Sequence, residues 1–187
     1  IDLSEQKAGI KLQLLTYMNE MCKQESAEPA GTFYYNLIEP MVKASQNMSD
    51  EQIEEELRKQ FKMRGLILAD VDIIRKMDKN LDTGSSNIIP ATINKDETLS
   101  KKASNISKQQ FEYLQKYTNK IIKQISEEIL SGNINIKPYY NTKNKKTPCE
   151  YCTYKSICQF GNGICKKEYN YISNLEKETI LEMMKEK

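Results

Sequence analysis

The chain has no histidine among its 187 residues, and it has no long apolar run. Without imidazole, a metal site in this chain must be built from cysteine or carboxylate ligands. No apolar stretch approaches the roughly 20 residues that a membrane-spanning helix needs, so we expect no membrane association. A secretory leader and an initiator methionine are also missing, since the chain begins Ile1-Asp2-Leu3. We therefore expect a piece of a longer protein. Its clustered cysteines, described below, favour the reducing cytoplasm.

Charge is distributed unevenly along the chain. The composition, with 39% hydrophobic and 29% charged residues, is ordinary for a globular protein with one core. Residues 137–167 contain seven lysines and one glutamate, a net charge of +6, so the remainder carries −4 of the overall +2. Such a basic segment suggests DNA as a partner, although a solvated lysine-rich loop explains the charge alone equally well. The candidate DNA-binding residues are Lys143, Lys145, Lys146 and Lys155.

Four of the five cysteines lie within 17 residues near one end of the chain. Cys149, Cys152 and Cys158 are spaced C-x2-C-x5-C, which suits one metal ion or one cluster. A disulfide framework would spread its cysteines along the chain, so a metal in a reducing compartment is favoured. The fourth ligand is open: Cys165 would complete a zinc site, and a cysteine outside this chain would complete an iron–sulfur site. Cys22 is expected to be a small buried apolar residue.

Caps and apolar periodicity predict an α/β fold that is rich in helix. Ser4 is the expected cap of a first helix, broadly buried, in which Gln13 and Tyr17 project to the same side. Capping signals also mark Ser49, Asp70 and Ser107. The expected helices cover residues 4–23, 50–63, 71–77, 108–131 and 174 onward, and the expected strands cover 32–38, buried on both faces, and 88–93.

Three stretches together resemble one protein family. Gln13 to Tyr17 is similar to the Q-x3-Y motif of RecB-type nucleases in the PD-(D/E)xK superfamily. Residues 148–160 are similar to the C-terminal iron–sulfur motif of such nucleases, and residues 29–36 and 65–72 resemble the AddB family in particular. AddB proteins are one of the two subunits of the bacterial AddAB helicase–nucleases.

The resemblance implies the C-terminal part of a restriction-endonuclease-like nuclease domain. Its expected segments are a core helix and strand (1–44), an insertion (45–105), a long helix (106–132) and a basic cysteine-cluster segment with a tail (133–187). The family implies an ATP-dependent machine that resects double-strand breaks for recombinational repair, with an AddA-type partner. Its AddB component cuts the 5′ to 3′ strand, using Mg²⁺.

The resemblance also assigns roles to individual residues. Gln13 would lie beside the Mg²⁺ site and Tyr17 would touch the DNA backbone. Cys149, Cys152 and Cys158 would hold a structural [4Fe–4S] cluster whose fourth ligand lies upstream. The family's metal-binding acids and D-Y-K element precede the Q-x3-Y helix, so we expect this chain alone to be inactive.

Two local imitations of a nuclease centre are rejected, and two other functions remain open. Asp70 and Asp72 follow an apolar strand but lack a suitably spaced lysine, and Glu56 to Lys59 is an E-x-x-K within a helix.

One alternative function is a non-catalytic, metal-stabilised DNA-binding or assembly module, whose exposed aromatics would stack on bases. The other is a CRISPR-associated RecB-like exonuclease, against which the segment 45–105 argues. The aromatics meant here are Tyr139, Tyr140, Tyr151 and Tyr154.

Overall fold

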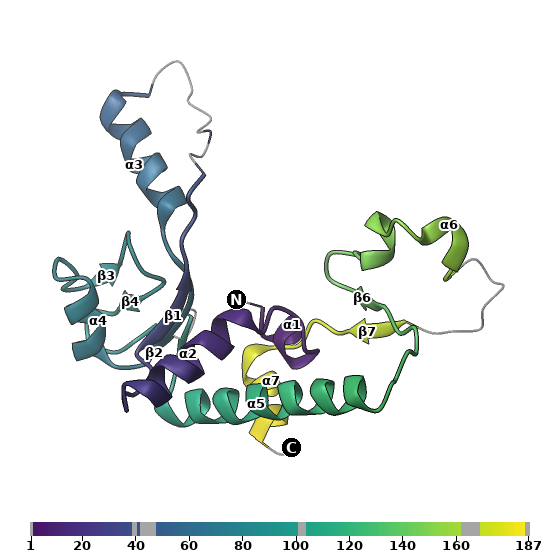
Figure 1. The fold of residues 1–187 in the computed structure, drawn as a ribbon. Coiled ribbons are helices and arrows are strands. Elements are labelled where there is room, and N and C mark those ends of the chain that lie inside the picture. Colours follow the sequence, from purple (N-terminus) through teal and green to yellow (C-terminus); the bar gives the residue numbers. More distant parts are fainter. Residues whose placement is uncertain (1, 39–40, 42–47, 101–103, 162–168, 186–187) are drawn as a thin grey trace. The chain divides into compact units, whose positions relative to one another are not determined.

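A computed structural model describes residues 2–38, 41, 48–100, 104–161 and 169–185 (Figure 1). The chain divides into two compact units, one of residues 13–115 and one of residues 2–12 with 116–187. The boundary falls inside helix α5 (Lys108–Leu130), so this helix contributes to both units. The four segments expected from the sequence do not coincide with this division, and they stay a prediction. No helix in the described ranges is long and apolar enough to cross a membrane.

The first unit is built on a small mixed sheet in the order β1-β2-β5. Strand β2 pairs antiparallel with β1 and parallel with β5, while β3 and β4 form an antiparallel pair of their own. The α/β class is as predicted. Besides the start of α5, its elements are α2 (Gln13–Gln24), β1 (Gly31–Tyr34), α3 (Asp50–Phe61), β2 (Arg64–Leu68), α4 (Val71–Met77), β3 (Gly84–Ser85), β4 (Thr92–Ile93) and β5 (Asn105–Ile106).

Three of the four predicted caps are confirmed, and the fourth, Ser4, is wrong because Ser4 lies inside its helix and Asp2 is the cap. Ser49 and Gln52 form a reciprocal capping box at the start of α3. The carboxylate of Asp70 accepts a hydrogen bond from the backbone N–H of Ile73 at 3.1 Å, as the cap of α4. At α5, the hydroxyl of Ser107 accepts from the N–H of Gln110 at 3.2 Å. Each cap satisfies a backbone donor that the first helical turn leaves without an intrahelical partner.

The strand prediction for residues 32–38 is only partly correct. Strand β1 ends at Tyr34, and the side chains of Tyr34 and Tyr35 are 49% and 53% exposed, so this edge is not covered on both faces. The covered strand is β2, which lies at the centre of the sheet. The core behind it consists of Ile67, Ile74, Leu81, Ile89, Ala91 and Ile93, none more than 5% exposed.

The single helix expected over residues 4–23 is wrong. It is two helices, α1 (Leu3–Lys7), capped by Asp2, and α2, with a tight turn between them. The turn contains two residues with positive φ, Gly9 at +79° and Lys11 at +56°. A Cβ at Gly9 would lie 3.3 Å from the side chain of Ile121 on α5. Glycine is required there because the backbone passes close to α5 in a conformation that other residues resist.

Helix α2 is not broadly buried, contrary to the expectation. Leu15 and Asn19 are its buried residues, whereas Tyr17 and Met21 are 59% and 56% exposed. The side-chain amide of Asn19 donates to the carbonyl of Gln115 on α5 at 3.3 Å. The buried stripe is therefore set by the partner helix.

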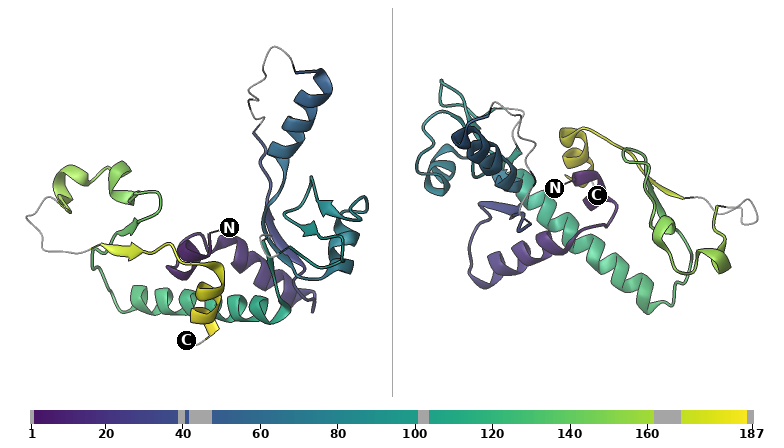
Figure 2. Two further views of the ribbon diagram at one scale, coloured as in Figure 1. Left: turned by 180° about the vertical axis from the view of Figure 1, so that it is seen from behind. Right: turned by 90° about the horizontal axis from the view of Figure 1, so that it is seen from above.

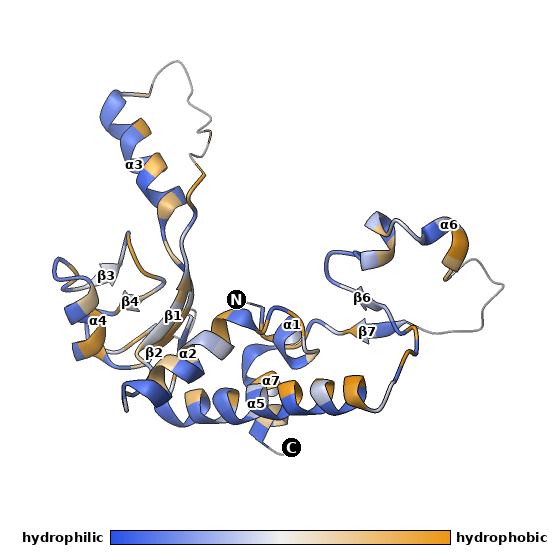
Figure 3. Ribbon diagram, viewed as in Figure 1, coloured by the Kyte–Doolittle hydropathy of each residue, from blue (hydrophilic) through white to orange (hydrophobic). Residues whose placement is uncertain are grey.

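The second unit joins the end of the chain to α1 and to the later turns of α5. Strands β6 (Tyr139–Asn141) and β7 (Asn170–Ile172) pair in parallel (Figure 2). Between them lie a 3-10 turn, η1 (Pro148–Tyr151), and a one-turn helix, α6 (Lys155–Cys158). Helix α7 (Lys177–Lys185) packs on α1 and buries Ile180, Leu181 and Met184. Apolar residues remain uncovered toward the C-terminal end of α5 (Figure 3), where Ile129 is 70% exposed.

A substitution at Gly65 tests the pairing of β1 with β2. A Cβ there would lie 2.0 Å from the carbonyl oxygen of Thr32 and 2.8 Å from the Cα of Phe33, both backbone atoms that cannot move without separating the strands. We expect Gly65→Ala to lower the free energy of unfolding by about 3 kcal/mol or more. The matched control is Gly84→Ala, whose Cβ meets nothing within 4 Å and which adopts a φ of +95°. Its cost should be about 1–2 kcal/mol in urea denaturation; equal costs would contradict the packing.

Candidate functional site

Gln13 and Tyr17 lie together on the surface of α2. Gln13 opens the helix, and its side-chain amide donates a hydrogen bond to the hydroxyl of Tyr17 at 2.9 Å. Both side chains are exposed. Their expected projection to one side is confirmed, and the turn at Gly9 to Lys11 is what makes Gln13 a first-turn residue. Their roles beside a metal and on DNA stay predictions.

Two of the carboxylates rejected as catalytic, Asp70 and Glu56, are engaged in local structure. Asp70 caps α4, and Glu56 lies 2.8 Å from the ammonium of Lys59 on the exposed surface of α3. Hydrogen bonds from Lys59 to Glu56 and then to Glu55 raise the pKa of that lysine. In the described ranges, no three Cys, Asp or Glu side chains come close enough together to hold a metal ion.

The three cysteines of the C-x2-C-x5-C run lie on two successive short turns. Cys149 is in η1, Cys152 is its C-terminal cap, and Cys158 ends α6. The thiols are free, exposed at Cys152 and half-buried at the other two positions. Three thiols on one short segment are a donor set for a soft ion or an iron–sulfur cluster. The structure places them on one segment without gathering the three sulfurs at one point.

The other two cysteines do not add a fourth thiol to these three in the structure. Cys165, the alternative fourth ligand, lies outside the described residues. Cys22 is half-buried on α2 rather than fully buried as expected.

The candidate DNA-binding lysines are all exposed in the second unit. Lys143, Lys145 and Lys146, here called the lysine turn, follow β6 directly, and Lys155 opens α6. Among the residues that the structure describes, none of the four forms an ion pair with a carboxylate. Their positive charge is therefore available to an external anion.

A buried contact that the sequence did not reveal holds the lysine turn. The side chain of Asn141, only 3% exposed, accepts from the backbone N–H groups of Lys143 and Asn144. Its amide donates to the carboxylate of Glu5 on α1 at 3.3 Å. The ammonium of Lys11 lies 2.8 Å from the other oxygen of Glu5, and this hydrogen bond raises the pKa of Lys11.

Sequence reasoning also missed an aromatic group beside the cysteine run. The ring of Tyr169 lies 4.9 Å from Phe160 and 5.6 Å from Tyr140, measured between centroids. Burial, and then the nearby charge of Cys149, raise the pKa of Tyr169. The alternation of Tyr169, Asn170, Tyr171 and Ile172 is the period-two signal of a strand that could have revealed this group.

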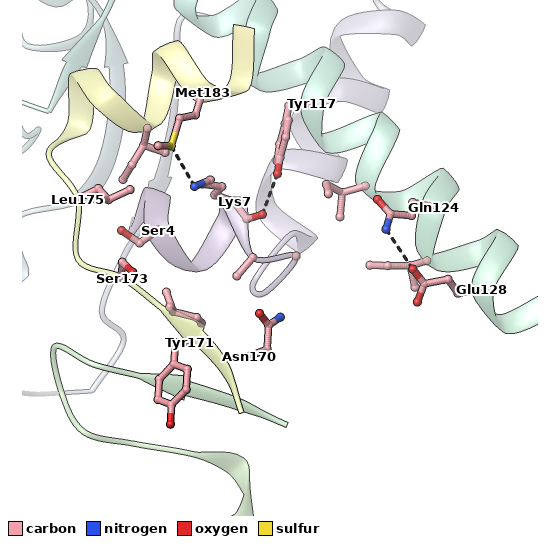
Figure 4. Close-up of a pocket in the computed structure, with 16 residues that line it drawn as sticks. Ser4, Lys7, Tyr117, Gln124, Glu128, Asn170, Tyr171, Ser173, Leu175 and Met183 are labelled. Atoms are coloured by element: carbon pink, nitrogen blue, oxygen red, sulfur yellow. Dashed lines mark hydrogen bonds between the residues drawn. The ribbon is translucent and has the colours of Figure 1, made fainter. Parts of the chain in front are cut away.

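A cavity of about 680 Å³ in the second unit contains none of the predicted site residues (Figure 4). Its labelled polar side chains largely satisfy one another or the backbone. Tyr117 donates to the carbonyl of Lys7 at 2.9 Å, and the amide of Gln124 donates to Glu128 at 3.0 Å. These partners leave little convergent charge for a ligand, so the cavity is not the predicted site.

Residues 2–159 match the family model of the PD-(D/E)XK nuclease superfamily, and the chain belongs to this superfamily. The chain is also similar to individual proteins that share one name. It is 40% identical over 181 residues, 94% of the chain, to the AddB subunit of the ATP-dependent helicase/deoxyribonuclease of Thermoanaerobacter sp. (strain X514). The proteins of the same name from Acetivibrio thermocellus and Bacillus thuringiensis (strain Al Hakam) are each 37% identical, over 97% and 100% of the chain. The resemblance seen in the motifs is thereby confirmed. The chain spans 16% of the length of each of these relatives.

Substitutions at Asp70 can distinguish a helix cap from a metal ligand. Asp70→Ala should lower the free energy of unfolding by about 1 kcal/mol, because the N–H of Ile73 loses its acceptor. Asp70→Asn keeps an oxygen acceptor and should match the unsubstituted protein in urea denaturation. A variant Asp70→Asn that is fully stable but has lost Mg²⁺-dependent DNA cleavage would show that this carboxylate is catalytic.

Proposed function

We propose that this chain is part of the nuclease domain of an AddB-type protein, in a helicase–nuclease that degrades DNA ends. The observation that carries the proposal is the similarity, over almost the whole chain, to proteins named as helicase/deoxyribonuclease subunits, within a superfamily of nucleases. The proposed reaction is hydrolysis of phosphodiester bonds in the strand that runs 5′ to 3′. Its proposed role is resection of double-strand breaks for recombinational repair in the cytoplasm.

Mg²⁺ is the proposed metal, and it would polarise the phosphate and activate water. We propose that its carboxylate ligands come from outside these 187 residues. Support comes from the two stretches of this chain that resemble a nuclease centre, because their carboxylates have structural roles. Asp70 caps a helix and Glu56 pairs with Lys59.

Gln13 and Tyr17 contribute to the proposed site as a pair. The hydroxyl of Tyr17 accepts from Gln13, so its own proton is available for a phosphate oxygen of the DNA backbone. The same hydrogen bond holds the amide of Gln13 in one orientation beside the proposed metal. Because both side chains are exposed on α2, DNA can reach them without rearrangement of the core.

A [4Fe–4S] cluster held by Cys149, Cys152 and Cys158 is the second part of the proposal. The fourth thiolate would come from elsewhere in the complete protein. Free thiols on two adjacent turns support this ligand set, and the absence of histidine from the chain favours an all-thiolate site. The role would be structural, because ligands far apart in sequence close a large loop when they bind one cluster.

The proposed partners are DNA and an AddA-type subunit. The exposed lysines Lys143, Lys145, Lys146 and Lys155 are the proposed contacts with the DNA backbone, since the structure gives them no carboxylate partner among the described residues. Phosphate contacts of this kind add affinity without reading sequence, as a processive degrading enzyme requires.

The nuclease proposal predicts a specific loss at Gln13. In the complete AddB-type protein with its helicase partner, Gln13→Ala should reduce Mg²⁺-dependent cleavage of linear duplex DNA by about 10–100-fold, as removal of a group beside a metal site does. ATP hydrolysis should be unchanged. Gln24→Ala, at the exposed far end of the same helix, is the matched control. The 187-residue chain by itself should not cut DNA with Mg²⁺; robust cutting would place the acids within this chain.

The cluster proposal predicts which cysteines bind iron. The complete protein purified without oxygen should be brown and contain about four iron atoms per chain. Changing Cys149, Cys152 or Cys158 to alanine should remove the colour and the iron, measured by absorbance and metal analysis. Cys22→Ala and Cys165→Ala should retain both. A requirement for Cys165 together with bound zinc would overturn the assignment.

A further inference from the structure

The β6–β7 ribbon has two chemically different faces. The parallel register places Tyr140 beside Tyr171 and Asn141 beside Ile172. Because side chains alternate along a strand, Asn141 and Ile172 share one face, and the tyrosines share the other. The first face is inside, since Asn141 and Ile172 are 3% and 5% exposed. The second face reaches solvent, since Tyr171 is 61% exposed.

Three tyrosines form this outer surface, which we call the tyrosine face: Tyr140, Tyr169 and Tyr171. The ring of Tyr171 lies 5.9 Å from Tyr140 and 6.2 Å from Tyr169, each at 65°. Edge-to-face contacts of this kind hold the rings in place. Figure 4 shows Tyr171 extending from β7 away from Lys7 and Met183. The result is a rigid aromatic surface that has solvent on one side.

The lysine turn begins at the end of the same ribbon. Residues 142–146 leave β6 directly after Asn141, whose side chain accepts from the N–H of Lys143 at 3.0 Å. The backbone of Asn141 also donates to the carbonyl of Lys146 at 2.9 Å, which closes the turn. Three exposed cations thus lie on an ordered turn, close in sequence to an exposed aromatic surface. Proteins that bind single-stranded nucleic acid combine these two elements, cations for the phosphates and rings for the bases.

We propose that the tyrosine face and the lysine turn together bind single-stranded DNA, with an unpaired base stacked on Tyr171 and phosphates on Lys143, Lys145 and Lys146. The inference rests on the proposed function, which supplies an unwound strand to this chain. Duplex DNA fits less well, because its bases are already stacked and paired and leave no free π-face. A protein surface also fits less well, because the three exposed lysines of the turn would need a matching set of carboxylates.

The test is fluorescence anisotropy with the purified complete protein, a labelled single-stranded oligonucleotide and the matching duplex. Tyr171→Ala should weaken binding of the single strand by about 5- to 100-fold, the range of one lost base stack, and should leave duplex binding unchanged. Tyr171→Phe keeps the ring and should bind like the unsubstituted protein. Tyr171→Leu keeps apolar bulk without a π-face and should bind as weakly as Tyr171→Ala. Tyr35→Ala, at an exposed tyrosine of the first unit, is the matched control and should have no effect.

Salt dependence separates the two halves of the proposed site. Lys145→Gln should reduce the slope of log affinity against log salt concentration by about 0.7, the value for one phosphate contact on a single strand. Tyr171→Ala should leave that slope unchanged, because stacking releases no counterion. Unaltered single-strand affinity in Tyr171→Ala would overturn the proposal. So would a loss of association with the helicase partner in Tyr171→Ala, since the tyrosine face would then be a protein interface. Neither result affects the nuclease proposal, which depends on cleavage by the Gln13 and Gln24 variants.

Discussion

The hydrogen bond between Glu5 and Asn141 is the contact on which the functional end of the second unit depends. It joins α1 to β6 across 136 positions of sequence, in a nearly dry environment. A carboxylate at such a site requires compensation, which Lys11 and the amide of Asn141 supply. Removal of either side chain would leave a buried polar group without its partner, at a cost of about 1–3 kcal/mol. The same asparagine shapes the lysine turn, so one buried amide connects the interior of the unit to its charged surface.

Local signals in the sequence identified three helix starts, missed the starts of α1 and α2, and did not show how narrowly α2 is buried. The caps at Ser49, Asp70 and Ser107 were predictable because each depends on residues no more than three positions away. The turn at Gly9 was not predicted, because it follows from the approach of Ile121, which is distant in sequence. The narrow burial of α2 was missed for a related reason. Leu15 and Asn19 face inward because α5 lies there, and periodicity alone cannot say where a partner helix lies.

The sequence predicted some parts of the candidate site and missed others. The pairing of Gln13 with Tyr17 follows from a spacing of four in a helix, and it was visible in the sequence. The proposed metal ligands are harder to predict, because the fold brings together the residues that bind one centre and the sequence gives only their identity. The aromatic group at Tyr169 and Tyr171 is hard to find for another reason. Its strand, β7, is only three residues long, and so short an alternation is a weak signal.

The parallel pairing of β6 with β7 has a thermodynamic consequence for everything between them. Parallel neighbours cannot be joined by a hairpin, so the cysteine run lies in a longer connection whose two ends are held side by side by the strand pairing. Pinning the ends removes much of the disorder that the loop would lose on binding a ligand through its thiols. By reciprocity, whatever gathers those sulfurs must also tighten the ribbon at the base of the loop. Binding of the proposed cluster would then be coupled to the order of the outer tyrosines.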